Sequence, residues 1–217
     1  MNSHKTTVVI SIGIALLLLV GGCATSRGVL KVQPIASVNP STGPEVKIVE
    51  VKDSREFQLK PPKPSIPSLK DGDINNPAKT SRAIARKRNG YGMALGDILL
   101  PEGQSVSGLA SAALVRGLRA SGYRVLEKGD PGYANAVPLV VEVQQFWAWF
   151  SPGFWSANLD FLATISVTGP LAPFTDGELF EGEIRLSTQV ANTKAWMNTV
   201  TKGLDNLDAD IQQKLSM

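Results

Sequence analysis

Residues 145–161 read QFWAWFSPGFWSANLDF and contain seven of the chain's 14 aromatic residues around a central Ser-Pro-Gly. Before this turn, over residues 137–149, Val137, Leu139, Val141 and Val143 share one face with Trp147 and Trp149, and after it apolar and polar residues alternate cleanly as far as residue 168. An alternation with a period of two is typical of a strand that buries one face. The stretch therefore predicts a long β-hairpin, and the sheet that this hairpin requires decides the fold class.

The alternation also predicts which residues of the hairpin face each other. Odd-numbered residues fall on the buried face of both strands, so the loop must keep odd residues opposite odd residues. A three-residue loop over 151–153 and a five-residue loop over 150–154 both do so, and both pair Trp149 with Trp155 and Val143 with Phe161. The residues expected beneath helices are Trp147, Trp149, Trp155 and Phe161. Those expected on the opposite face, at the hairpin tip, are Phe146, Phe150 and Phe154.

The remaining elements are expected on both sides of the hairpin. Apolar residues recur at helical spacing over 104–120 and 193–214, which predicts two helices that each bury one side. Further strands are expected over residues 46–51, 93–99 and 178–188, and a short helix from Pro77 to about Arg88. We predict an α+β fold of two layers, in which two amphipathic helices pack on one face of a mainly antiparallel sheet.

The first residues of the chain have the layout of a secretory signal peptide. MNSHK precedes an apolar run of 15 residues, and Gly21-Gly22-Cys23 follows it. The run is shorter than the roughly 20 residues that cross a bilayer as a helix. Leu19 to Cys23 resembles the bacterial lipobox, and Cys23 is the only cysteine of the chain.

The lipobox resemblance implies that the chain is cut before Cys23 and that this residue carries acyl chains such as palmitate. Ala24 follows the cysteine, which in lipobox proteins implies sorting to the outer membrane. We therefore expect a signal peptide over 1–22, a lipidated Cys23 with a flexible tether over 23–44, and one periplasmic domain over 45–217. The expected location is the periplasmic side of the outer membrane of a bacterium.

The residues of the expected mature chain exclude several kinds of chemistry. The only histidine is His4, inside the signal peptide, so Ser-His-Asp and Cys-His catalysis have no base. Zinc and copper sites would lack their usual ligands. The run from Asp71 to Arg82 does not fit a calcium loop, because Asn76 stands where glycine is needed and Arg82 where a glutamate is needed. We expect no enzyme activity, no metal and no cofactor.

A proline-rich and basic excursion over residues 56–90 interrupts the domain. Residues 46–90 contain 11 Lys and Arg against 5 Asp and Glu. The excess positive charge indicates either contact with an anionic envelope surface or a solvated loop. Arg86, Lys87 and Arg88 form the candidate interaction surface together with Phe146, Phe150 and Phe154. Nucleic acid is not an expected partner of an exported protein.

Three segments resemble the YajG-like family of uncharacterised bacterial lipoproteins. They are VEVKDSR over 49–55, LASAALVRGLRASGYRV over 109–125 and VVEVQQF over 140–146. The resemblance covers about residues 45–215 and implies no catalytic residues.

Taken with the lipobox, these features lead to an expected function. We expect a lipid-anchored lipoprotein whose domain is a non-catalytic interaction or envelope-assembly module with an unknown partner. The alternative is a module that binds a glycan or lipid through the aromatic residues of the hairpin tip. A third hypothesis is a hydrolase built on two carboxylates, which requires two acidic residues across one pocket.

Overall fold

A computed structural model of the chain describes residues 25–153 and 156–216. In chain order its strands are β1 (Gly28–Val29), β2 (Glu45–Asp53), β3 (Ala83–Arg88), β4 (Ala94–Leu99), β5 (Arg124–Val125), β6 (Val137–Pro152), β7 (Ala157–Thr168) and β8 (Glu178–Thr188). Its helices are α3 (Pro77–Thr80), α4 (Val106–Ala120) and α5 (Thr193–Leu215), with 3-10 turns at η1 (Lys70–Asn75) and η2 (Phe174–Asp176).

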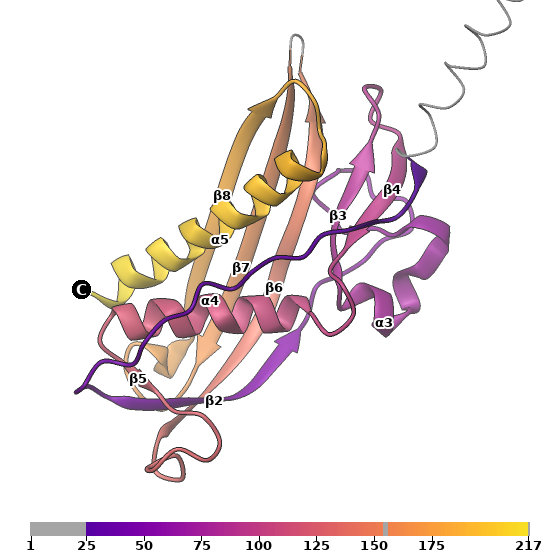
Figure 1. The fold of residues 1–217 in the computed structure, drawn as a ribbon. Helices are drawn as coiled ribbons and strands as arrows, with labels where there is room; N and C mark the ends of the chain where they lie inside the picture. The colour runs from indigo at the N-terminus through magenta and orange to yellow at the C-terminus, as the bar shows by residue number, and fades with distance from the viewer. Residues whose placement is uncertain (1–24, 154–155, 217) are drawn as a thin grey trace, which may run out of the picture.

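The described strands form one mixed, eight-stranded sheet with the long β6 at its centre (Figure 1). Strands β7 and β8 follow antiparallel on one edge of β6. The other edge is shared, because β2 runs parallel to the first half of β6 and β3 runs parallel to residues near its end. Strand β5 extends the β2 side, while β4 and β1 extend the β3 side.

The predicted fold class, a mainly antiparallel two-layer sheet, is therefore wrong. Four of the seven strand pairings are parallel: β1 with β4, β2 with β5, β2 with β6, and β3 with β6. The sequence shows which residues of a strand are buried, but it does not show which neighbour the strand pairs with or in which direction. Here β2 and β3 both enter beside β6 in the same direction as β6 itself.

The predicted helix over 77–88 is also wrong beyond its first turn. Asn76 caps α3 by accepting a hydrogen bond from the backbone N–H of Ala78 at 3.1 Å, and Pro77 occupies the first helical position. The helix ends at Thr80, and residues 83–88 form strand β3. Residues 83–86 are all buried, so packing into the sheet overrides their local helical preference.

A β-bulge in β6 changes the register of the hairpin. Val143 pairs with Ile165 but Gln145 pairs with Thr164, so Gln144 is an extra residue on the β6 side. One extra residue turns every following side chain to the other face. The predicted pairs of Trp149 with Trp155 and Val143 with Phe161 are wrong, and Pro152 pairs with Ala157 where a loop was expected. Phe154 and Trp155 lie outside the described residues.

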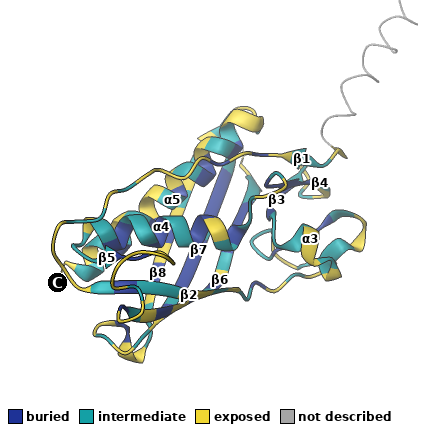
Figure 2. Ribbon diagram, turned by 60° about the horizontal axis from the view of Figure 1, so that its bottom comes forward, coloured by how far each residue is buried: buried dark blue, intermediate teal, exposed yellow. Residues whose placement is uncertain are grey.

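Helices α4 and α5 lie side by side across one face of the sheet, over its most buried strands (Figure 2). Because of the bulge, Phe146 belongs to this face, where its ring meets that of Phe161 edge-on at a centroid distance of 5.0 Å. Gly203 of α5 lies directly over Phe161, and Gly182 of β8 lies against the backbone of α5. Because glycine has no side chain, these two positions allow α5 to lie close to the sheet.

The proline-rich excursion covers the part of the opposite face near the end of β6, whereas Val140 and Leu179 on this face are 37% and 45% exposed. Trp147, which was expected beneath the helices, points to this face instead. It is fully buried, and it packs with Leu69 and the half-buried Phe57. Its indole Nε1 donates a hydrogen bond to the carbonyl of Pro64 at 3.2 Å. Arg55, with a fully buried side chain, donates to the carbonyls of Thr80, Ala83 and Phe146 and fixes the excursion to the sheet. The excursion is therefore a structural layer of the domain.

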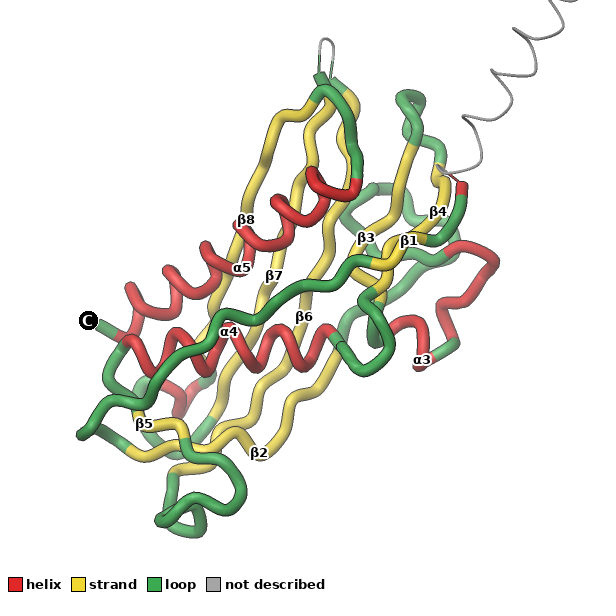
Figure 3. Tube along the Cα trace, in the orientation of Figure 1, coloured by secondary structure: helices red, strands yellow, loops and turns green. Residues whose placement is uncertain are grey.

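Residues 27–44, here named the N-terminal strap, run across the domain near α4 and α5 (Figure 3). Leu30 and Val32 are buried in the main core, and the Leu30 N–H donates to the carbonyl of Leu99 at 2.9 Å. Arg119 of α4 donates to the carbonyl of Ser37 at 2.8 Å. This segment therefore differs from the flexible tether expected from the sequence. Its apolar residues are few, but Leu30 and Val32 are spaced so that both enter the core.

Candidate binding site

A cavity of about 410 Å³ lies where the strap, the β3–β4 pair, the end of β6 and the start of α5 meet. This volume falls within the roughly 300–1,000 Å³ that is typical of small-ligand sites. Its apolar lining residues are Val29, Leu30, Leu95, Ile98 and Phe150. The polar and basic residues in its wall include Lys87, Arg88, Asn192 and Trp196.

The polar part of the wall contains buried hydrogen-bond donors without an acceptor. Among the described residues, nothing accepts from Nε and Nη2 of Arg88 or from Nε1 of Trp196. Arg88 uses only Nη1, which donates to the carbonyl of Gly92 at 2.9 Å. Trp196 is 2% exposed. Since buried polar groups are nearly always hydrogen-bonded in folded proteins, these donors need an explanation.

The same part of the wall is electrostatically positive. Burial lowers the pKa of the Arg88 guanidinium below its ordinary value, because the charged form loses hydration without gaining a carboxylate partner. None of the described lining residues is acidic. Lys87 adds a second charge from β3, and the N-terminus of α5, capped by Asn192, directs the positive end of the helix dipole toward the cavity.

The predicted candidate residues separate into three groups in the structure. Phe150, Lys87 and Arg88 come together on the cavity wall. Phe146 is fully buried beneath the helices, so it is not part of a surface. Arg86 is buried on the excursion side and donates to the carbonyl of Leu95 at 2.8 Å. The other two, Cys23 and Phe154, lie outside the described residues.

The sequence did not indicate the two features that complete this cavity. Trp196 falls in the apolar stripe of the last helix, where a tryptophan is expected only to fill the core. Val29 and Leu30 lie in the segment that the sequence predicted to be a tether. Both residues are recognisable as cavity-lining only when the strap is placed on the sheet, since β1 of the strap pairs with β4 and shares the cavity wall with residues of β3 and α5.

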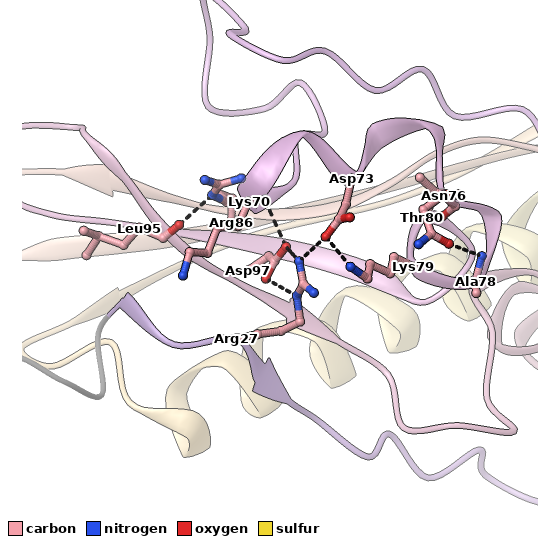
Figure 4. A network of polar contacts seen from close by, with 10 residues as sticks. All are labelled: Arg27, Lys70, Asp73, Asn76, Ala78, Lys79, Thr80, Arg86, Leu95 and Asp97. Atoms are coloured by element: carbon pink, nitrogen blue, oxygen red, sulfur yellow. Dashed lines mark hydrogen bonds and ion pairs between the residues drawn. The ribbon is translucent and has the colours of Figure 1, made fainter.

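The strap is fixed beside this cavity by a group of charged residues, which we name the Arg27 clamp (Figure 4). Arg27 donates to both carboxylate oxygens of the fully buried Asp97, at 2.8 and 3.1 Å, and to Asp73 at 2.8 Å. Lys79 also donates to Asp73, at 2.5 Å. The hydrogen bond from Lys79, and next that from Arg27, lower the pKa of Asp73. The clamp thus joins the strap, β4 and the excursion.

A second cavity, of about 460 Å³, lies under the excursion on the other side of the sheet. Glu56 and Glu142 both line it, so the hypothesis of a hydrolase built on two carboxylates applies to this cavity. The neighbouring Ser54 hydroxyl, and next the ammonium group of Lys52 at 3.6 Å, lower the pKa of Glu142. A general acid needs a pKa raised toward the working pH, so Glu142 has the opposite tuning.

Two further features that would bear on function are absent from the described residues. Within residues 25–153 and 156–216, no three His, Cys, Asp or Glu side chains are grouped as a metal ion would require. In the same ranges, no helix combines the length and the apolar character needed to cross a bilayer.

Comparisons with known proteins give no functional assignment. No protein-family model matches the chain, and no curated protein is significantly similar in sequence. Among solved structures, one described as the crystal structure of an uncharacterized protein is similar, with 8% identity and a TM-score of 0.48. The matched region covers 88% of this chain and 99% of that one. The resemblance to YajG-like lipoproteins therefore stays a prediction from the sequence.

Proposed function

We propose that the protein is a lipid-anchored lipoprotein of the bacterial outer membrane, with Cys23 as the lipidated residue and the domain on the periplasmic side. The domain acts as a non-catalytic interaction or envelope-assembly module. The Arg27 clamp supports this proposal, because it fixes the chain to the domain very soon after the lipobox.

The distance between anchor and domain follows from the chain length between them. Arg27 is four residues beyond Cys23, and an extended chain spans at most about 3.6 Å per residue, so the lipid would hold the clamp within roughly 14 Å of the bilayer surface. The flexible tether expected from the sequence would have allowed a larger separation. A module held this close meets its partners at the membrane surface, with Lys87 and the β3–β4 turn nearest to the anchor.

The lipid anchor can be tested by metabolic labelling with an alkyne fatty acid. We expect the wild-type protein to be labelled and to fractionate with the outer membrane. Cys23→Ser should abolish the label, whereas Ser26→Ala, a change of similar size beside it, should not. Equal labelling of wild type and Cys23→Ser would contradict the assignment of Cys23.

The close approach can be tested with a fluorophore at two exposed positions. Tyr91, 92% exposed, lies in the β3–β4 turn, while Lys128 is an exposed residue beyond β5. Because the strap starts beside β4 and ends beside β5, dyes on Tyr91→Cys should be quenched by nitroxide headgroups and dyes on Lys128→Cys should not. Equal quenching at both positions, or none at Tyr91, would contradict the proposed orientation.

A further inference from the structure

The three orphan donors of the cavity indicate what a ligand there must supply. A tryptophan N–H and an arginine guanidinium donate hydrogen bonds and accept none. The missing partner of Arg88 and Trp196 must therefore be an acceptor. Both residues line the same cavity, so small rotations of the two side chains, whose donor atoms are covered as they stand, would let one acceptor group bound there satisfy both.

The charges around the cavity indicate that the acceptor is an anion. Lys87 and Arg88 add positive charge, the described lining residues include no carboxylate, and the first turn of α5 forms part of the wall. A helix of 23 residues favours negative charge at its N-terminus. A neutral acceptor such as water would satisfy the hydrogen bonds but would leave the charge of the half-buried Arg88 uncompensated.

The remainder of the cavity requires an apolar group on the same ligand. Val29, Leu95, Ile98 and Phe150 also line the cavity, and a small inorganic anion would leave the space beside them unfilled. A volume of about 410 Å³ is near the lower end of the range for ligand cavities, so it suits one chain better than a lipid with several.

We propose that this cavity binds an amphiphile with one anionic headgroup and one acyl chain. The headgroup accepts hydrogen bonds from Arg88 and Trp196, and the chain lies against Phe150, Leu95 and Ile98. The headgroup is a carboxylate or a phosphate monoester, since both accept from a guanidinium in the same way. The inference goes beyond the proposed function and does not depend on lipidation of Cys23.

The test uses the full-length protein in nanodiscs of zwitterionic lipid, with three photoreactive probes of equal chain length. The probes are a fatty acid, a monoacyl phosphate and the corresponding fatty alcohol. We expect saturable cross-linking to peptides containing Phe150, Leu95 or Trp196 with the two acids. The alcohol should bind at least about tenfold more weakly, because it lacks the charge that Arg88 stabilises. The stronger of the two acids identifies the headgroup.

Matched variants separate the headgroup contacts from general effects. Arg88→Gln and Trp196→Phe should weaken cross-linking of the acids about tenfold and several-fold, respectively. Arg82→Gln and Trp147→Phe, the same changes outside this cavity, should leave it unaltered. If Arg88→Gln does not fold, the comparison of acid with alcohol in wild type still decides the question. Cross-linking that does not saturate, that is equal for acid and alcohol, or that is unchanged in both cavity variants would overturn the proposal.

Discussion

The tightest contact between helix and sheet gives the sharpest prediction about stability. Gly203 lies in the middle of α5, directly over the ring of Phe161 in β7. In Gly203→Ala, the new Cβ would lie 2.6 Å from Cε1 of Phe161 and closer still to Cδ1. Phe161 is fully buried and packs edge-on against Phe146, so its ring has no free volume to enter.

Two opposing effects decide the magnitude for Gly203→Ala. Replacing glycine by alanine within a helix stabilises it by about 1 kcal/mol. Overpacking a closely packed core costs about 1–3 kcal/mol, and more when the neighbours cannot move. The steric effect should dominate here because two ring atoms are affected and the ring is confined. We expect a net loss of about 2 kcal/mol, which is roughly 4–8 °C in Tm for a chain of this size.

The assay compares thermal and urea unfolding of Gly203→Ala with two reference variants. Gly108→Ala, near the start of α4, places its Cβ 3.3 Å from Ser105 Oγ, so it should be much less destabilising. Phe161→Leu combined with Gly203→Ala should recover part of the loss, because the smaller side chain removes the ring. The reasoning is refuted if Gly203→Ala is as stable as wild type or if the double variant shows no favourable coupling.

Three other changes test the clamp and the bulge. Asp97→Asn should lower the free energy of unfolding by about 2 kcal/mol, because Arg27 loses its buried charged acceptor; equal urea midpoints for variant and wild type would contradict this. Asp73 has a folded pKa below its ordinary value of 3.8, so its bonds with Lys79 stabilise the fold above that pH and are lost as the pH falls through the folded pKa. The Tm difference between wild type and Asp73→Asn should therefore narrow below about pH 4, and a constant difference would count against the pairing. Deleting Gln144 should abolish folding, whereas Gln144→Ala should retain it, as judged by circular dichroism; a folded deletion variant would show that the bulge does not set the register.

The elements that the sequence could predict are those whose pattern is local. The strand over 178–188 and the two long helices bury one side over many residues, so their periodicity identifies them without knowledge of their neighbours. The bulge at Gln144 leaves no local mark, because apolar residues occupy both odd and even positions after it. A single unpaired residue therefore placed Phe146 and Trp147 on the opposite faces from those expected.

Only some residues of the cavity could be predicted from the sequence. Charge and aromatic content identify Lys87, Arg88 and Phe150 as candidate surface residues, but the sequence predicts the first two in the last turn of a short helix and Phe150 at the tip of a hairpin. Their meeting depends on the parallel pairing of β3 with β6 and on the strap, both of which are long-range contacts. Trp196 could not be recognised, since the lack of a partner for an indole N–H is a property of packing alone.

The strap also determines how the domain would respond to mechanical load. Tension applied through the first described residues reaches the Lys87–Ser26 hydrogen bond, the Arg27 clamp and the β1–β4 pairing first. These contacts bear the force at the same time. The contacts farther along the strap, from Val32 to Asn39, would break one after another. The first event under force would therefore be release of β1 from β4, which opens the cavity wall formed by Val29 and Leu30 while α4, α5 and the central sheet remain folded.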